Sequence, residues 1–442
     1  QVTPQIKSTH MRTFKKILTG GAALVAVLAV AGLALTHQGE IATQASIPSA
    51  DFTPQQIAKG KLLAAMGDCA VCHTAANGKT NAGGLAMPSP FGTIYTSNIT
   101  PDMQTGIGSW TYEAFERAMR HGVDREGQYL YPAFPYTAFS RVTDEDMKDL
   151  YAFLMSEPAV SNEAPKTALN FPYNVRRGIA AWNWLNLKPG VVADDAQQAP
   201  EWNRGAYLVE GLGHCSACHT PRNGMAAEKT GEFHFAGGSA EGWDAPALTS
   251  KSASPLPWTK GDLVDYMKTG FSERHSVAAG PMAPVAHGLS QQSDADIDAI
   301  ATYLMSYRDA NAAPGDAKAL IEEKTAKPKL ALDTEGYRLY QGACMACHRA
   351  DPSASTFGVR PQLALSTSLH SASPDNAIMA VLEGVQNPAH ADLGTMPAFR
   401  HALSDAQIAT LLNTMRMQYG VDAWKDLPAK VGQLRKQSQA QH

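Results

Sequence analysis

The sequence lacks several features that identify common classes of protein. Its six cysteines all lie in three short strings, so none is left for a disulfide. The net charge of −4, with no basic run beyond a few cations near the N-terminus, gives no electrostatic footprint for nucleic acid. No Ser/His/Asp arrangement, glycine-rich phosphate loop or recognisably spaced pair of carboxylates is present. Nucleic acid is therefore set aside as a partner, and redox chemistry on an organic substrate would need a second protein.

The three cysteine strings share the form C-x-x-C-H. They read CAVCH, CSACH and CMACH, at 69–73, 215–219 and 344–348. A C-x-x-C pair alone could be a redox dithiol or half a zinc site, but the histidine that follows indicates covalent attachment of c-type haem. Three such strings with no spare cysteine make this a specific signal.

The spacing within each string fits this chemistry. Residues at i and i+3 lie on one side of a helical turn, so both sulfurs can reach the two vinyl positions of one porphyrin. The histidine at i+4 then directs its imidazole at the iron. We therefore predict three covalently bound haem c groups, attached and ligated by Cys69, Cys72 and His73, by Cys215, Cys218 and His219, and by Cys344, Cys347 and His348.

An apolar segment near the N-terminus predicts a membrane location. Arg12, Lys15 and Lys16 precede residues 17–36, which carry no charge. About twenty apolar residues span a bilayer core, whereas a secretory signal has a shorter apolar region and a small-residue cleavage site. We expect a retained anchor in the inner membrane, the alternative being a long signal peptide cut near Ala45. Because the positive residues precede the segment, the haem domains would lie in the periplasm.

The haem strings belong to a longer internal repeat. Each copy opens with a helical pattern that ends at the haem string. Each copy closes with a helix that has an N-cap hydroxyl and Asp or Gln three residues later, at Thr143 and Asp146, Ser293 and Asp296, and Ser404 and Gln407. Between these lies an amphipathic helix that ends in glycine, at Gly122, Gly270 and Gly384.

This is the helical plan of a small class I cytochrome c, in which the first and last helices cross beside the haem. The predicted fold is all-α, with three tandem class I cytochrome c domains after an N-terminal transmembrane helix. Residues 187–200 and 308–329 are expected to be linkers without an apolar period, and 87–110 a loop-like insertion at the first haem's edge. The predicted divisions are an N-terminal segment with its anchor at 1–40 and domains at 41–186, 200–307 and 330–442, the last with a C-terminal tail.

Two methionines occupy one register of the repeat. Met282 and Met396 each stand twelve residues after the glycine that ends the middle helix, and neighbouring prolines stiffen both loops. Histidine with methionine as axial ligands raises the potential of a haem used for electron transfer. We predict that these methionines ligate the second and third irons, the alternative being core methionines. The first copy has Phe134 in this register, and a benzene ring offers no lone pair to iron.

The first haem is therefore either five-coordinate or ligated by another residue. Met119 is the leading candidate, because it lies on the apolar face of the middle helix, three residues before its terminal glycine. Met267 holds the same position in a copy that already has Met282, so Met119 could also be a core residue. Met87 and His121 are weaker candidates, and His121 is interpreted as solvated or capping. The other histidines, including His214, His234, His275 and His287, lack metal-ligand spacing and are interpreted as surface or satisfied core residues.

With these residues in place, the chain resembles the triple-haem cytochrome c subunits of membrane-bound periplasmic dehydrogenases of acetic acid bacteria. The resemblance covers residues from about 55 to 425. Beyond the haem strings it rests on PFGTIYTSNITPDMQTGIG (90–108), LYPAFPY (130–136), EWNRGAYLVEGLGHCSACHTPRN (201–223) and EGWDAPALT (241–249). It implies that a catalytic subunit oxidises the substrate, that electrons pass along three haems, and that ubiquinone in the membrane accepts them.

Such subunits serve quinoprotein alcohol dehydrogenases, flavoprotein gluconate, sorbitol or fructose dehydrogenases, and molybdopterin aldehyde dehydrogenases. The alcohol branch typically reads LYPAMPY and its mature chain lacks an N-terminal anchor. LYPAFPY, the anchor, FPYNVRRGIAAWNWL (171–185) and WKDLPAKVGQLR (424–435) instead resemble the cytochrome subunit of the molybdopterin aldehyde dehydrogenase type. That resemblance implies a molybdopterin-containing catalytic subunit with an iron–sulfur subunit as the partner.

Two other functions stay open from the sequence. A five-coordinate first haem could bind substrate beside Phe134, as in a peroxidase, although no distal acid–base pair is evident apart from His121. The chain could also be a subunit of a terminal oxidase or a free-standing membrane-bound carrier. We expect the chain by itself to be non-catalytic toward the organic substrate and to act within an oxidoreductase complex.

Overall fold

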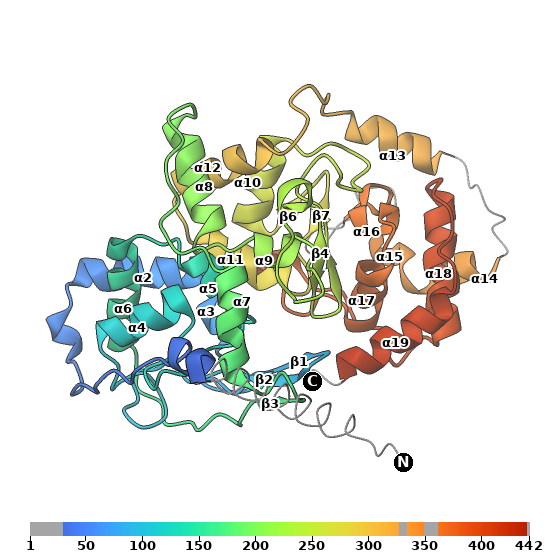
Figure 1. The fold of residues 1–442 in the computed structure, drawn as a ribbon. Helices are drawn as coiled ribbons and strands as arrows, with labels where there is room; N and C mark the ends of the chain where they lie inside the picture. The colour runs from blue at the N-terminus through green and yellow to red at the C-terminus, as the bar shows by residue number, and fades with distance from the viewer. Residues whose placement is uncertain (1–29, 327–333, 349–360, 440–442) are drawn as a thin grey trace, which may run out of the picture.

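The computed structural model describes residues 30–326, 334–348 and 361–439 (Figure 1). The helices fall into three groups that follow one another along the chain. Figure 1 shows the first group in blue and cyan up to the green helix α7, the second from green to yellow and light orange, and the third in orange and red. Each group contains a haem string, one helix before it and two main helices after it.

The helices of the first group lie within residues 49–186. They are η1 (Ser49–Asp51), α2 (Pro54–Met66), α3 (Cys69–Cys72), α4 (Tyr112–His121), α5 (Tyr136–Phe139), α6 (Asp144–Ser156), η2 (Arg176–Gly178) and α7 (Ile179–Asn186). Those of the second are α8 (Pro200–Glu210), α9 (Ser216–His219), η3 (Gly231–Phe233), α10 (Lys260–Thr269), α11 (Met282–Ser290) and α12 (Asp294–Met305). After α13 (Ala317–Thr325), those of the third are α14 (Glu335–Ala343), α15 (Met345–His348), η5 (Leu363–Leu365), α16 (Thr367–His370), α17 (Asp375–Glu383), η6 (Ala391–Leu393), α18 (Asp405–Gln418) and α19 (Leu427–Gln439).

A glycine lets the opening helix of each group touch the closing helix. The crossing pairs are α2 with α6, α8 with α12, and α14 with α18. An added Cβ would lie 1.9 Å from the Asp149 carbonyl oxygen at Gly60, 2.0 Å from the Ala299 carbonyl oxygen at Gly205, and 1.8 Å from the Thr414 hydroxyl oxygen at Gly336. Because no other residue fits this distance, the same crossing is encoded three times, eight to ten residues before a haem string.

The predicted helix ends are confirmed. The hydroxyls of Thr143, Ser293 and Ser404 each accept a hydrogen bond from the backbone amide three residues on, and Ser404 forms a full capping box with Gln407. The three terminal glycines have φ values of 61°, 71° and 69° at Gly122, Gly270 and Gly384. A positive φ favours glycine, which has no Cβ, so the middle helices end where the sequence predicts.

The first two groups share one hydrophobic core. Leu63 and Leu150 of the first group belong to the same buried cluster as Leu212 and Ile300 of the second. α11 packs directly on α2, where a Cβ at Gly288 would lie 2.3 Å from the Ala65 carbonyl oxygen. The third group has a core of its own, formed by α14 to α19. A small cluster that includes Ala286 and Leu393 joins the second group to the third.

The prediction of an all-α fold is wrong, because the described residues include three small antiparallel sheets. The first joins β1 (Ala86–Ser89), β2 (Gly92–Tyr95) and β3 (Ala168–Leu169), the second β4 (Gly238–Ala240) and β5 (Trp243–Ala245), and the third β6 (Phe271–Ser272) and β7 (Ser276–Val277). The expected loop-like insertion begins with the β1–β2 hairpin, whose turn is Pro90–Phe91. Strands of two to four residues are too short to show an alternating pattern.

The predicted transmembrane helix is also not present in the described part of the chain. Of residues 17–36, those from 17 to 29 lie outside the described residues, and 30–35 are helical. Within the described ranges, no helix combines the length and apolar character needed to cross a membrane. After Thr36 the chain runs along the first group, where the Ile41 amide donates to the Arg125 carbonyl (2.9 Å) and the Gln44 amide to the Ser109 carbonyl (2.9 Å).

One predicted linker also differs from the structure. Residues 187–199 form no helix, as expected. Residues 308–329, expected to lack regular structure, contain α13, whose N-cap is Asp316. The Asp316 side chain accepts a hydrogen bond from the Ala319 amide at 3.0 Å. This local N-cap starts the helix, although none of its residues is buried in a core.

Candidate haem sites

The first haem string follows the end of α2 directly. Cys69 and Cys72 lie on the single turn of α3, and His73 ends it. His73 Nδ1 lies 2.6 Å from the Ser97 carbonyl oxygen. A carbonyl can only accept, so Nδ1 carries the proton and Nε2 presents its lone pair. This is the tautomer and orientation that an iron ligand needs.

The other two strings repeat this arrangement. His219 Nδ1 lies 2.7 Å from the Pro246 carbonyl oxygen, and His348 Nδ1 lies 3.3 Å from that of Pro361. Burial lowers the pKa of both His73 and His219, while their backbone hydrogen bonds act in the opposite sense. Both imidazoles are thus held neutral, as metal ligation requires.

Four of the six cysteines do not have the character of reactive thiols. All six are free in the structure. Burial raises the pKa of Cys69 and of Cys215 to about 12, and that of Cys72 and of Cys344 to about 11. Redox-active and zinc-binding cysteines need a stabilised thiolate, and no cluster of three or more His, Cys, Asp or Glu in the described ranges could hold a metal ion. Thioether attachment, which consumes the thiol, fits these sites better than a dithiol or zinc centre.

A cavity of about 2630 Å³ adjoins the first two strings. It exceeds the roughly 300–1,000 Å³ of a site for one small molecule. Cys69, Cys72 and His73 line it on one side and Cys218 on another, and much of the remaining lining is apolar. The volume and lining fit large planar apolar groups attached at both strings. None of the described residues of the third string lines this cavity. Residues 383–387, at the end of α17 in the third group, do line it.

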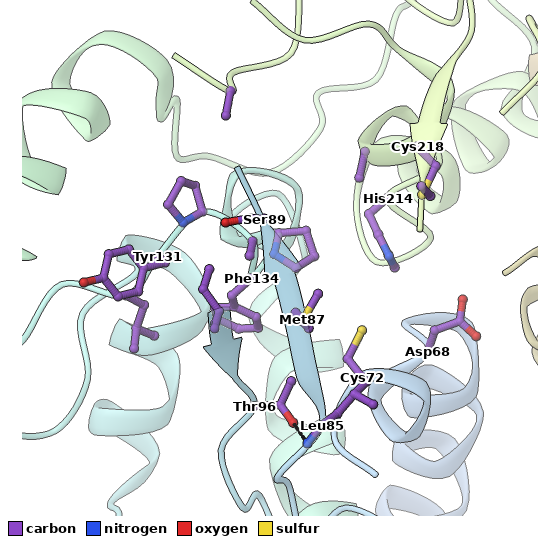
Figure 2. Close-up of a pocket in the computed structure, with 18 of the residues that line it drawn as sticks. Asp68, Cys72, Leu85, Met87, Ser89, Thr96, Tyr131, Phe134, His214 and Cys218 are labelled. Atoms are coloured by element: carbon purple, nitrogen blue, oxygen red, sulfur yellow. Dashed lines mark hydrogen bonds between the residues drawn. The ribbon is translucent and has the colours of Figure 1, made fainter. Parts of the chain in front are cut away.

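The cavity contains two of the candidate ligands for the first iron. Met119 of α4 is 6% exposed and lines the cavity. Met87 of β1 lines it too, as does Phe134, and Figure 2 shows both side chains. His121 is exposed and does not line it, and its backbone carbonyl accepts from Asn183 at 3.2 Å. The structure therefore brings Met119 and Met87 to the cavity and leaves His121 at the surface, in line with its interpretation as solvated.

The register that relates Phe134 to Met282 is supported by a shared hydrogen bond. The carbonyl of Gly122 accepts from the Leu130 amide at 2.7 Å, and that of Gly270 accepts from the Ala278 amide at 2.8 Å. Each donor stands eight residues after its glycine and four before the ligand register. The backbone contact thus supports the register, although Phe134 lines the large cavity and packs on the first core, whereas Met282 belongs to another cluster.

The two candidate methionines have different surroundings. Met282 begins α11 and is half-buried against a cluster that includes Tyr266 and Phe271. Met396 pairs with Val385 through two backbone hydrogen bonds of 3.0 Å, and its carbonyl oxygen would lie 2.2 Å from a Cβ at Gly384. Neither side chain lines the large cavity. Their ligation of iron stays a prediction.

The space between the first two strings holds two residues that the sequence analysis did not assign to a site. Figure 2 shows Asp68 and Cys72 on one side and His214 and Cys218 on the other. Both Asp68 and His214 directly precede the first cysteine of a string, with left-handed φ values of 49° and 37°. That position next to the string is the one sequence signal that would have drawn attention to His214, which was interpreted as a surface or core residue.

The Asp68 carboxyl is close to both strings. It raises the pKa of Cys69 and Cys72 in its own string and of Cys215 and Cys218 in the other. Burial raises the pKa of Asp68 itself to about 7. Asp68, Cys72 and Cys218 line the same cavity, and Figure 2 shows Asp68 with Cys72 on one side and Cys218 on the other.

Two of the other histidines in the described residues make structural contacts. His275 is buried, with Nδ1 2.8 Å from the Ser254 hydroxyl and Nε2 3.3 Å from the Asp262 carboxylate. His234 Nε2 contacts the Glu210 carboxylate at 2.7 Å, and Glu210 also contacts Arg141 at 3.1 Å. Because Arg141 precedes α6 and Glu210 ends α8, this network joins the first two groups.

Known proteins resemble this chain along most of its length. The cytochrome c family model matches residues 57–157 and 334–416. A nicotinate dehydrogenase subunit of Pseudomonas putida is 46% identical over 413 residues, covering 93% of this chain and 34% of that protein. The fructose dehydrogenase cytochrome subunit of Gluconobacter japonicus is 37% identical over 436 residues, covering 93% and 87%. The cytochrome c subunit of the quinone-dependent alcohol dehydrogenase of Gluconobacter oxydans is 35% identical over 392 residues, covering 83% and 79%.

These matches differ in how much of each relative they cover. The chain spans about a third of the nicotinate dehydrogenase subunit but most of the fructose and alcohol dehydrogenase subunits. All three relatives are named as subunits of dehydrogenases. The two that the chain covers most fully are named as cytochrome subunits. The chain therefore belongs to the family of cytochrome c subunits of dehydrogenase complexes, and its cytochrome c domains imply covalently bound haem c.

Proposed function

We propose that the chain carries three covalent haem c groups and passes electrons from a dehydrogenase catalytic subunit to ubiquinone, at the periplasmic side of the inner membrane. The observation that carries this proposal is the threefold repetition of one site. Each copy places a C-x-x-C-H string after a glycine-mediated helix crossing, and fixes the histidine through Nδ1 on a backbone carbonyl. Haem supplies one-electron chemistry when bound there.

The residues of the chain then have three tasks. The six cysteines hold the haems, and His73, His219 and His348 ligate the irons from one side. We assign Met282 and Met396 to the opposite side of the second and third irons, on their register in the repeat, and Met119 to the first. The apolar cores exclude water from each site, which sets the potential together with the axial ligands.

The second domain is proposed to lie in the middle of the electron path. It shares a core with the first domain, and residues of both haem strings line one cavity. It contacts the third domain through Asp244, whose amide donates to Asn376 at 2.7 Å and whose carbonyl accepts from the Asn376 amide group at 2.7 Å. This arrangement supports a path in which electrons cross the second haem on the way between the other two.

The proposed catalytic partner is a molybdopterin aldehyde dehydrogenase with an iron–sulfur subunit. Support comes from LYPAFPY and the segment 171–185, which resemble that branch, and from Phe134, which lies at the cavity where the alcohol branch typically has methionine. Cytochrome subunits of fructose and alcohol dehydrogenases are also similar to the chain. The partner must therefore be identified by isolating it.

Purification under mild detergent tests the proposal. We expect a large cofactor-bearing dehydrogenase to co-purify and the complex to reduce ubiquinone with an aldehyde, and less with alcohols or sugars. Isolation as a lone chain, or with a copper–haem oxidase, would contradict the proposed role. Fast peroxide turnover by the isolated subunit, with a high-spin signal from one haem, would favour a peroxidase.

The number of haems is tested separately on the purified chain. Haem quantitation and intact mass should give three haems per chain. Replacing both cysteines of one string by serine, as in Cys215→Ser with Cys218→Ser, should leave two. Two haems in the unmodified chain would show that one string is unused.

A further inference from the structure

A surface strip at residues 164–193 is basic, aromatic and free of acidic residues. It contains Lys166, Arg176, Arg177 and Lys188 but no Asp or Glu. Arg176 donates to the Tyr129 carbonyl at 3.3 Å and lies 5.1 Å from the centre of the Tyr131 ring. Arg177 donates to the Leu33 carbonyl at 3.3 Å. Both arginines are thus positioned by backbone carbonyls, and Arg176 also lies within electrostatic reach of the Asp124 carboxyl. Arg177 is exposed, so its charge faces solvent.

The same strip exposes large apolar side chains. Surface apolar residues are normally scattered singly, and a contiguous exposed patch indicates an interaction site. Here five such side chains occur within fifteen residues of one another: Phe171 (80% exposed), Tyr173 (50%), Val175 (51%), Trp184 (66%) and Leu185 (67%). Leu33, whose carbonyl binds Arg177, is 54% exposed and extends the patch.

The patch also marks an opening of the large cavity. Tyr173, Val175 and Leu185 are at least half exposed and yet line the cavity. Phe91 of the β1–β2 turn packs on Tyr173, with ring centroids 4.4 Å apart, and lines the cavity too. From this opening the same cavity reaches Phe134, beside the first haem string. An apolar route therefore leads from the strip to the first site.

We propose that the strip seats the protein on an anionic lipid bilayer, with the cavity opening at the lipid surface. Trp, Tyr and Phe favour the interface between headgroups and acyl chains, and Lys and Arg are attracted to anionic headgroups. The core of a protein interface is depleted of charge, whereas the surface of an anionic bilayer accommodates exposed aromatics and cations together. A quinone would then enter the cavity from the lipid without crossing water. This last step rests on the proposed function; the seating on lipid does not.

Thiol accessibility tests the seating on the full chain in its purified complex. The native cysteines are attached to haem, so one engineered cysteine is the reactive thiol; unattached native cysteines would be seen as extra mass additions. Phe171→Cys and Trp184→Cys are compared with Met417→Cys, a side chain on α18 of the third domain that is 37% exposed. Each is treated with a charged, membrane-impermeant maleimide, with and without vesicles of phosphatidylcholine and phosphatidylglycerol.

We expect the vesicles to slow labelling at positions 171 and 184 about tenfold, because thiols at headgroup depth react only in the unbound minority. Labelling at 417 should not change. If the complex sediments with the vesicles and yet labels at full rate at 171 and 184, another segment binds the membrane and the proposal fails. It also fails if the complex does not bind the vesicles. Slow labelling at 171 and 184 before vesicles are added would mean that the partner subunit covers the strip, which would also overturn the seating on lipid.

A second measurement tests entry of the quinone. Trp184→Ser with Leu185→Ser should raise the KM for ubiquinone in vesicles several-fold and leave reduction of ferricyanide unchanged. Both side chains are exposed, so the fold should be retained. An unchanged KM would refute entry at this strip. Absence of quinone reduction in the unmodified complex would instead refute the proposed acceptor and leave the labelling result to decide the seating on lipid.

Discussion

Gly205→Ala tests whether the helix crossing of the second domain holds its structure together. The added methyl group would lie 2.0 Å from the Ala299 carbonyl oxygen and 2.7 Å from Tyr303 Cβ. Ordinary contact begins near 3.4 Å, so α8 and α12 would have to separate by about 1.4 Å, the difference between 3.4 and 2.0 Å. Overpacking of this kind costs about 1–3 kcal/mol, whereas the higher helix propensity of alanine contributes roughly 1 kcal/mol in its favour.

The difference between these two terms is about 0–2 kcal/mol. We expect the upper half of this range, a net destabilisation of about 1–2 kcal/mol, because a backbone carbonyl cannot rotate away as a side chain can. For a unit of 150–250 residues, that corresponds to a Tm about 2–8 °C lower. Calorimetry of the purified holoprotein, with haem content measured in parallel, would show it. The matched control is Gly342→Ala in α14, where nothing lies within 4 Å of the new Cβ, and which should be neutral or stabilising. An unchanged or higher Tm for Gly205→Ala would refute the reasoning.

Three further predictions follow from single side chains. Phe134→Met should alter the absorption spectrum of the first haem and leave the other two unchanged, because it supplies a ligand in the register of Met282; no spectral change would mean that the register was misassigned. Burial raises the pKa of Asp262, but hydrogen bonds from His275 and Thr259 outweigh it, and the net pKa lies well below its ordinary value. The carboxylate therefore stabilises the fold at neutral pH, and this contribution is lost as the pH falls below about 4. Asp262→Ala should lower stability by about 1–3 kcal/mol near neutrality and by less in acid, and an equal loss in denaturant melts at both pH values would contradict this. Arg416→Met removes the buried donor to the Leu369 carbonyl (2.8 Å) and should cost a similar amount in the same melts, whereas Lys318→Met on the exposed α13 should change little.

The helical framework was predictable from local chemistry. Ser404 and Gln407 form a capping box because both partners lie within four residues, and Gly270 ends its helix through its own backbone conformation. The haem strings were equally clear, since the chemistry of attachment fixes their spacing. Such features depend on residues that are close in sequence. They therefore recur at the same spacing in each copy of the repeat, and comparison of the copies reveals them.

The features that were missed depend on contacts between distant residues. The β1–β2 hairpin is completed by Ala168–Leu169, more than seventy residues away, and strands this short leave no periodic trace. His214 lines a cavity only because the first two domains pack together, with its ring 5.5 Å from that of Phe139. The sequence of either domain alone contains no information about that contact.

The shared core of the first two domains limits how the protein can be shortened. A cut between α7 and α8 would expose the buried faces of Leu212, Val142 and their neighbours to water, and would leave Gly288 without the Ala65 carbonyl it packs on. Each half would then be prone to aggregate. A cut before α14 leaves the main core of the third group in one piece, because that part of the chain has its own core, although it separates α13 from η5 and β5 from α17. An engineer who wishes to make a smaller redox module should therefore remove the third group of helices and keep the first two groups as one piece.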